Sequence, residues 1–472
     1  MKVTLIYPGI TECGFNSLKG NEGSWMNHGL AIISAVLKNK GYVVNLIDLR
    51  RLKGWEHFKQ VVRDDVEDVV GITMMSVDYD AGVMAANIIK EINPKVKIFV
   101  GGPHASICPD ELENVQSIDC IVRGEAEITF PNLLLDLANG SNLPKVVEGI
   151  RLDNLDDSPW ADRDLFQSPE EPFVPFLKPP FVTLIASRGC KYNCNYCQPA
   201  ERIMFGKKVR RRSVLSVINE LKCLNDRYHF NSFMIHDDCL TEDRQWVIDF
   251  CKQYKAERFT QPFVAQSRAD IICKHPDMIK ALYKAGLRLC IIGFESGSDR
   301  VLKFLRKGAN RAQNLEAARI CKTTGIKIWA NYMLGIPTES KEEVLETLSM
   351  LESIKPYHCS PAFYTPHPGS DLFAIGKEMG IHLITNHSSY RRNTYEPKIK
   401  GPDYDFLKNV LYKSIAVGED NLPQNDVIKE FSFVFLFKNI RGRLKILLLS
   451  KFPKTYHFLK SITKKFFIYH II

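Results

Sequence analysis

Short apolar runs alternate with amphipathic stretches over the first 145 residues. The apolar runs have the length and composition of buried strands, and they lie at 3–7, 43–47, 69–73, 96–101 and 120–122. Between them, residues 30–40 and 81–92 repeat apolar side chains at helical spacing. This alternation predicts a doubly wound, Rossmann-like domain, in which helices cover both faces of a parallel sheet.

The same alternation resumes at residue 181. The expected strands lie at 181–186, 231–236, 262–267, 288–293, 327–333 and 359–364. Helical patterns separate them, for example at 277–285 and 341–354. Six such units predict a partial, open (β/α)6 barrel, so the fold class is α/β throughout. In barrels of this type, chemistry takes place at the carboxyl ends of the strands.

The segments outside these two regions are of three kinds. Residues 146–180 are rich in Pro and Asp and read as a linker. Residues 381–430 carry no motif, and we expect a small helical C-terminal region there that caps the barrel. The predicted division is therefore a first domain at 1–145, the linker, a barrel at 181–380, the cap, and a tail at 431–472.

The tail carries the chain's excess of positive charge. The 472-residue chain has a formal net charge of +9, and residues 431–472 hold nine Lys or Arg and no acid, so the rest sums to about zero. Because these bases interleave with aliphatic and aromatic residues, a nucleic-acid role is disfavoured. The tail has two apolar runs, at 431–437 and 444–449, and neither is long enough to span a bilayer.

An amphipathic helix of this composition can lie in a membrane interface. The alternative is that its apolar face packs on the barrel. The first apolar run of the chain is too short for a signal peptide, so we expect a cytoplasmic protein. If the tail binds membrane, the protein is peripheral on the inner face and a lipid-linked substrate becomes the better prediction.

Three of the 13 cysteines lie on one short loop that follows the strand predicted at 181–186. Cys190, Cys194 and Cys197 are separated by three and then two residues. A four-iron cluster held by three thiolates keeps one iron open, and that iron can chelate a small molecule with an amine and a carboxylate. Structural zinc would need a fourth ligand, for which Cys223 or His236 is available, but the second paired motif usual in such sites is missing.

Polar clusters follow four consecutive predicted strands of the barrel. They lie at 236–238, 267–270, 293–298 and 331–337. Taken singly, each could have a purely structural role, such as an Asp that caps a helix or an ion pair between Glu295 and Arg268. Their recurrence at matching positions favours a binding site. In the first domain, Gly101-Gly102 and Gly124 lie at strand ends, where small residues let a large planar ligand approach the backbone. No G-x-G-x-x-G follows the first strand, which disfavours a dinucleotide.

The cysteine loop resembles the motif of the radical S-adenosylmethionine (SAM) superfamily, in which an aromatic residue precedes the last cysteine. Cys190, Cys194, Tyr196 and Cys197 match it in full. The resemblance implies a 4Fe-4S cluster, with these cysteines as metal ligands, whose open iron binds SAM. It also implies an electron donor such as flavodoxin or ferredoxin, and cleavage of SAM to a 5'-deoxyadenosyl radical that abstracts a hydrogen atom.

The same resemblance implies the residues that contact SAM. Tyr196 would pack near the adenine, and Lys307 would neutralise the methionine carboxylate. Asp237-Asp238 replaces the glycine-rich second-strand motif of other subfamilies, a form that resembles the cobalamin-dependent class. The implied SAM-binding residues are Tyr196, Asp237, Asp238, Arg268, Glu295, Ser296, Lys307, Asn331 and Met333.

The first domain resembles the cobalamin-binding domain that precedes the radical SAM domain in one large class. The resemblance implies cobalamin as a cofactor. The usual histidine ligand to cobalt is absent, because residues 8–21 contain no histidine. We expect His104 to be a turn histidine near the corrin or the core rather than a replacement ligand. The implied cobalamin-binding residues are Ser76, Gly101, Gly102, His104, Arg123, Gly124 and Glu125.

These resemblances predict a cobalamin-dependent radical SAM enzyme. C-methylation of an unactivated carbon, in a small-molecule or lipid-linked substrate, is the leading prediction. A radical SAM oxidative cyclase or rearrangement enzyme is the first alternative. A non-catalytic cobalamin or metal sensor, whose cysteines bind zinc, is the alternative of another class. No residue is predicted to be catalytic beyond the cofactor ligands.

Overall fold

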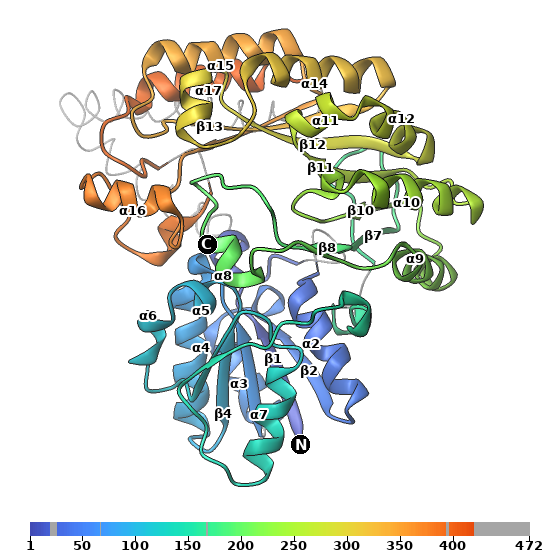
Figure 1. Ribbon diagram of the computed structural model, residues 1–472. Helices are drawn as coiled ribbons and strands as arrows, with labels where there is room; N and C mark the ends of the chain where they lie inside the picture. The colour runs from blue at the N-terminus through green and yellow to red at the C-terminus, as the bar shows by residue number, and fades with distance from the viewer. Residues whose placement is uncertain (19–25, 67, 167–168, 393–395, 420–472) are drawn as a thin grey trace, which may run out of the picture. The chain divides into compact units, whose positions relative to one another are not determined.

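The structure is a computed structural model that describes residues 1–419, except for 19–25, 67, 167–168 and 393–395 (Figure 1). The tail predicted at 431–472 and the last part of the region predicted at 381–430 lie outside the described residues. Within the described part of the chain, no helix combines the length and the apolar character that crossing a bilayer requires.

The first sheet has six parallel strands in the order β2-β1-β3-β4-β5-β6. β1 lies in the interior, where Leu5 pairs with Leu46 on one side and Gly71 on the other. The carboxyl ends of all six strands therefore meet at one edge of the sheet. The strands are β1 (Lys2–Tyr7), β2 (Val43–Asp48), β3 (Val69–Thr73), β4 (Lys97–Gly101), β5 (Cys120–Arg123) and β6 (Val146–Glu148).

Two separate apolar cores cover the two faces of this sheet, because the strands are apolar on both sides. Phe58 of α3 and Ile89 of α4 pack into one core, and Leu30 of α2 and Leu134 of α7 into the other. This is the doubly wound arrangement that the sequence predicts. The helices are α1 (Ile10–Cys13), α2 (His28–Asn39), α3 (Trp55–Asp65), α4 (Tyr79–Ile92), α5 (Pro103–Ile107), α6 (Pro109–Glu113) and α7 (Thr129–Ala138), with single turns η1 (Leu49–Arg51) and η2 (Ser76–Asp78).

The segment between the two sheets is well packed. Its short helices η3 (Leu155–Asp157) and η4 (Arg163–Phe166) precede Val174 and Leu177, which are buried against side chains from β7, β10, β11 and β12. Glu170 pairs with Phe181 through two backbone hydrogen bonds. The segment therefore fills one face of the second sheet, the face that the barrel helices do not cover.

The second sheet has six parallel strands in the order β14-β13-β12-β11-β10-β7. Each strand pairs with the next one in the chain, and the helices between them lie on one side of the sheet (Figure 1). This open six-stranded arrangement is the predicted partial barrel. The strands are β7 (Phe181–Leu184), β10 (Ser232–Ile235), β11 (Phe263–Ser267), β12 (Leu287–Glu295), β13 (Lys327–Leu334) and β14 (His358–Phe363).

The barrel helices begin at polar caps that satisfy their first backbone N–H groups. Asn310 and Ser340 each form a reciprocal capping box, with Gln313 and Glu343 respectively. The helices are α9 (Val214–Tyr228), α10 (Arg244–Ala256), α11 (Ala269–Lys274), α12 (Pro276–Ala285), α13 (Asp299–Phe304), α14 (Arg311–Thr324) and α15 (Lys341–Ile354), with the single turn η5 (Leu240–Glu242).

The described part of the C-terminal region contains α16 (Asp371–Glu378), the single turn η6 (His387–Tyr390) and α17 (Tyr404–Ile415). Leu407, Val410 and Leu411 of α17 belong to the barrel's main core, and Ser414 hydrogen-bonds the hydroxyl of Tyr332 on β13 at 2.5 Å. α17 is thus an outer helix of the barrel.

A buried carboxylate connects the linker to the barrel, and its removal tests how much this connection stabilises the fold. Glu220 of α9 is 3% exposed and lies between Arg163 of η4, at 3.2 Å, and Arg212. Glu220→Ala leaves the buried Arg163 and the half-buried Arg212 without their counter-charge, so we expect the free energy of unfolding to fall by about 3–5 kcal/mol. Urea denaturation followed by tryptophan fluorescence measures the change.

Glu257→Ala is the matched control. Glu257 pairs with Lys222 at 2.7 Å, but both side chains are open to solvent, so its loss should change the free energy of unfolding by less than about 1 kcal/mol. Equal effects of the two substitutions would show that the Glu220 ion pairs stabilise the fold no more than an exposed ion pair does.

Candidate functional site

The three cysteines of the motif lie on a loop that we name the cluster loop, residues 187–199. It begins with β8 (Ser187–Arg188), which pairs with β9 (Arg210–Arg211), and ends before α8 (Ala200–Phe205). Cys194 accepts backbone hydrogen bonds from Cys197 and Gln198, which curl the loop into a tight turn. The backbone of Asn195 donates to Leu305 and accepts from Leu372. Backbone bonds to segments on both sides of β13 and β14 therefore hold the loop.

The cysteine side chains differ in exposure. Cys194 is buried, Cys190 is half-buried and Cys197 is exposed. Burial raises the pKa of Cys190 to about 12. A positively charged metal centre would be needed to hold this sulfur as a thiolate at neutral pH.

The three cysteine sulfurs are not gathered closely enough to share one zinc ion. Thiolates that share one tetrahedral zinc lie about 3.8 Å apart, given Zn–S bonds of about 2.3 Å. Among the described residues, no set of three metal-ligating atoms within 4.8 Å of one another includes any of these cysteines. In a four-iron cluster each thiolate binds a different iron, so the thiolates stand farther apart.

The two adjacent aspartates after β10 have different surroundings. Asp237 is 1% exposed, and it accepts hydrogen bonds from the backbone of Ala186 and Ser187 at 2.7 and 3.0 Å and from the Ser187 hydroxyl at 2.6 Å. These bonds use both of its oxygens to anchor the start of the cluster loop. Asp238 instead lines a cavity. Burial, followed by the charges of Asp237 and Glu242, raises the pKa of Asp238 to about 6.

Arg268, after β11, lies beside the cluster loop. Its Nη1 is 3.6 Å from the Cys194 sulfur, and its guanidinium group stacks on Tyr192, 3.5 Å from the ring centroid. Asp270 accepts from its Nε at 3.0 Å. Arg268 therefore places a buried positive charge beside one of the three sulfurs of the motif.

A second polar network joins the cluster loop to β12. Glu295 forms an ion pair with Lys307 at 2.9 Å, and the Tyr196 hydroxyl donates to Glu295 at 3.0 Å. Lys307 also lies 3.3 Å from that hydroxyl. Glu295 has φ 65°, which is unusual for a residue other than glycine and marks local strain of the kind found at functional sites. Burial, then the charge of Glu295, raises the pKa of Tyr196 well above its ordinary value.

The other three predicted SAM contacts lie in different surroundings. Met333 packs in the same apolar cluster as the ring of Tyr196. Asn331 accepts a hydrogen bond from the indole N–H of Trp329 at 3.1 Å. Ser296 is fully buried, and its hydroxyl lies 3.2 Å from that of Thr347 and accepts from the backbone of Ser298. Ser296 therefore shapes the loop and does not face an open site.

A cavity of about 650 Å³ lies at the carboxyl edge of the first sheet. Its size is within the range of ligand pockets. One wall is made of strand-end residues that include Gly71, Gly101 and Gly124, and another includes Arg188 of the cluster loop and Asp238 after β10. The cavity is therefore bounded by residues of both sheets.

The structure brings only some of the predicted cobalamin contacts to this cavity. Gly101, Gly102, Gly124 and Glu125 line it. A Cβ at Gly101 would meet nothing closer than 3.8 Å, so this glycine leaves open space, whereas one at Gly102 would lie 2.7 Å from the Thr73 hydroxyl.

Ser76, His104 and Arg123 are not among the lining residues. The Arg123 side chain forms an ion pair with Glu148, and His104 is fully buried with its Nδ1 3.2 Å from the Ser76 hydroxyl. The donor set at the cavity edge is thus glycine backbone and charged side chains, which suits a large polar-rimmed ligand approached by the main chain.

Buried ion pairs connect this edge to the cluster loop. Glu125 accepts from Arg210 Nη1 at 2.9 Å and lies 3.4 Å from Arg188, which also pairs with Glu127 at 2.6 Å. Burial alone would raise the pKa of Glu125, but the hydrogen bond from Arg210 holds it below its ordinary value. Glu125 therefore orients the two basic residues of β8 and β9.

Sequence reasoning missed three residues of the site. Tyr192 supplies the ring on which Arg268 stacks. Gly293 makes room for the Glu295–Lys307 pair, because a Cβ there would lie 2.4 Å from the Glu295 carboxylate. Glu201 of α8 has a buried oxygen without a partner among the described residues, and burial, then Asp238, raises its pKa. Only Tyr192, an aromatic within the motif loop, offered any signal.

Comparisons with known proteins agree with this geometry. The B12 binding domain model matches residues 21–134, and the radical SAM superfamily model matches residues 184–351. An uncharacterised methyltransferase of Pyrococcus horikoshii is 29% identical over 463 residues, which cover 94% of this chain and 98% of that protein. The anaerobic magnesium-protoporphyrin IX monomethyl ester cyclase of Rubrivivax gelatinosus is 25% identical, covering 79% of this chain and 69% of the relative.

Solved structures show the same fold. The radical SAM methyltransferase TsrM of Kitasatospora setae superposes with a TM-score of 0.64 at 14% identity, covering 88% of each chain. The two matched domains imply cobalamin, SAM and a 4Fe-4S cluster as cofactors, as predicted. The chain belongs to the radical SAM superfamily, in the class whose members carry a B12-binding domain before the radical SAM domain.

Proposed function

We propose that the protein is a C-methyltransferase that acts on an unactivated carbon. The observation that carries this proposal is the cavity at the carboxyl edge of the first sheet, which residues from the cluster loop and from the end of β10 also line. Two cofactor sites that share one cavity can act on one substrate. The name of the Pyrococcus relative supports methyl transfer.

The cofactors supply the chemistry, and the chain positions them. When bound, the cluster and SAM supply a radical that removes a hydrogen atom from the substrate, and cobalamin supplies the methyl group. Cys190, Cys194 and Cys197 would hold the cluster. Arg268 would place a positive charge beside the Cys194 sulfur, and Asp237 would hold the loop in position.

The residues proposed for SAM surround the Glu295–Lys307 pair. Lys307 would neutralise the SAM carboxylate, and Glu295 would hold the ammonium group of Lys307 in place. Tyr196 and Met333 would form the apolar wall beside the adenosyl group, since their side chains share one cluster. Asn331 and Asp238 remain proposed contacts, whereas Asp237 and Ser296 would act through the loops that they hold.

For cobalamin, we propose contacts at Gly101, Gly102, Gly124 and Glu125. These residues line the cavity, and the glycine backbone allows close approach of a planar ligand. We propose domain limits at residues 148, 180 and 415 in place of the predicted 145, 180 and 380, because β6 belongs to the first sheet and α17 packs in the barrel core. We propose that the substrate is a small or lipid-linked molecule and that the electron donor is flavodoxin or ferredoxin.

Oxidative ring formation is the second candidate, because the Rubrivivax relative is named a cyclase. One experiment separates the candidates. The anaerobically reconstituted protein is incubated with reductant, cobalamin, methyl-labelled SAM and an extract of cells that lack the protein. Methylation predicts 5'-deoxyadenosine together with S-adenosylhomocysteine and label in a new product. Cyclisation predicts 5'-deoxyadenosine with label left in methionine, which would contradict our proposal.

The Cys194→Ala variant should lose all 5'-deoxyadenosine in this assay, because one iron of the cluster loses its ligand. Cys223→Ala is the control, since Cys223 is an exposed thiol on α9, and it should keep full activity. A wild-type protein that binds zinc at the cluster loop and makes no 5'-deoxyadenosine would favour the non-catalytic sensor.

Lys307→Gln tests the proposed SAM contacts. It removes the charge that pairs with Glu295, so the Glu295 carboxylate would repel the SAM carboxylate. A charged hydrogen bond of this kind contributes roughly 1.5–3 kcal/mol, so we expect SAM to bind about 10- to 100-fold more weakly in calorimetric titrations. Lys303→Gln, an exposed neighbour on α13, should bind SAM normally. The proposal fails if both variants bind alike while retaining iron.

We also propose that the tail at 431–472 binds membrane and that the substrate is lipid-linked. The support is the interleaving of nine basic residues with aromatic and aliphatic ones in that segment. Full-length protein should float with anionic liposomes in a density gradient, and a chain truncated after Glu430 should not. Equal flotation of the two forms would rule out the tail as the membrane contact and would support packing of its apolar face on the barrel.

A further inference from the structure

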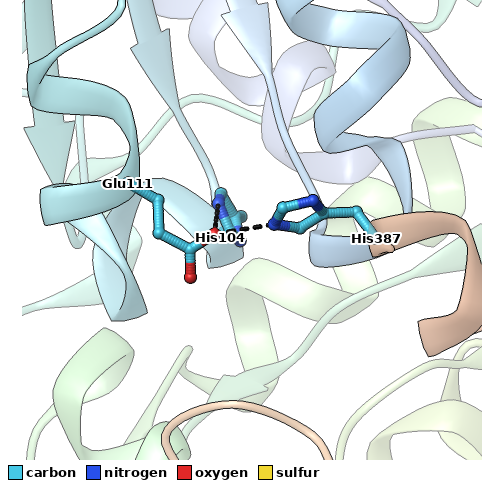
Figure 2. Close-up of side chains that lie close together, drawn as sticks. All are labelled: His104, Glu111 and His387. Carbon is cyan, nitrogen blue, oxygen red and sulfur yellow. Dashed lines mark hydrogen bonds and ion pairs between the residues drawn. The ribbon is translucent and has the colours of Figure 1, made fainter. Parts of the chain in front are cut away.

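His104, Glu111 and His387 converge from distant parts of the chain (Figure 2). His104 lies on α5 and Glu111 on α6 of the first domain, whereas His387 begins η6 after the last barrel strand. One ligand atom from each side chain lies within 4.8 Å of the other two. Tyr79 stacks on the His387 ring, with 3.9 Å between the centroids, and keeps it in place.

The buried ring of His104 carries an unpartnered nitrogen that faces this group. The ring is 0% exposed, and its Nε2 has no hydrogen-bond partner among the residues that the structure describes. The Glu111 carboxylate lies 3.9 Å from this nitrogen, which is too far for a hydrogen bond. If Nδ1 donates to the Ser76 hydroxyl, 3.2 Å away, the lone pair of Nε2 points toward a carboxylate. A cation between the two would satisfy both groups.

The distances suit a metal of that kind. Ligands on a tetrahedral zinc ion, with bonds of about 2.0–2.2 Å, lie about 3.4 Å apart. The 3.9 Å between His104 and Glu111 and the 2.7 Å between His387 and Glu111 lie on either side of that value. Two histidines and one carboxylate form a zinc donor set, with the fourth position left for water. Small rotations of the partly exposed Glu111 and His387 side chains would complete it.

We propose that His104, Glu111 and His387 bind a zinc ion that fastens η6 to the first domain. None of the three residues lines the cavity, and none belongs to the cluster loop, so the proposal stands apart from the catalytic function. The site is a structural clamp. It joins the chain that follows the last barrel strand to helices of the first domain. The described contacts of His387 there are ion pairs with Glu111 and Asp80 and ring contacts with Tyr79 and His104.

Zinc binding to the full-length protein tests the proposal. The cluster is first reconstituted so that the cysteines hold iron, and the protein is then dialysed against zinc and its metal content measured. Wild type should hold one zinc ion per chain, and zinc should raise its melting temperature. His387→Gln and Glu111→Gln should bind zinc at least about 10-fold more weakly and lose that rise. His57→Gln, which removes an exposed histidine of α3, should behave as wild type.

A second variant excludes zinc at the cluster loop. The chain in which Cys190, Cys194 and Cys197 are all replaced by Ala should still bind one zinc ion. Loss of zinc in that chain, equal binding by His387→Gln and wild type, or no zinc in wild type would each overturn the proposal. In the last case His387 and Glu111 form only an ion pair. Normal iron content and SAM cleavage in His387→Gln would show that the variant is folded.

Discussion

The site depends on a buried set of ion pairs that crosses from the first sheet to the cluster loop. Glu125 and Glu127 stand at the end of β5, and Arg188 and Arg210 stand on the two short strands that frame the loop. Buried charges are stable only when paired and hydrogen-bonded, so these groups must meet in one geometry. The pairs thereby fix the distance between the cavity and the cysteines, which a purely apolar contact would leave free to slide.

The backbone of the fold was predictable because both sheets are parallel and buried on both faces. Their strands read as continuous apolar runs, and helices with one apolar face separate them. The cysteine motif could also be recognised from the sequence, since its three cysteines are close together in the chain. The cavity's glycines could be placed because strand ends converge at one edge of a parallel sheet.

The directions of individual side chains could not be predicted. Asp237 and Asp238 are neighbours in the sequence, yet one holds the backbone of the cluster loop and the other faces the cavity. Ser296, in the loop after β12, turns toward Thr347 of α15, and His104 turns toward His387, 283 positions later in the chain. Such outcomes depend on partners from distant segments, and a single sequence contains no signal that connects them.

The strand order of the barrel has a consequence for how the chain assembles. Every barrel strand pairs with its predecessor, from β7 through β14, so each unit can dock as soon as it is made. Domains fold largely from the N-terminus during synthesis. The carboxylates of β5 would then already be in place when Arg188 and Arg210 emerge, and the cluster loop would meet a finished partner. By contrast, the Glu295–Lys307 pair must wait for β12, and so must Leu305 and Leu372, which bond the backbone of Asn195. The start of the cluster loop can therefore be anchored early, whereas the part that carries the cysteines is completed together with the strained half of the site.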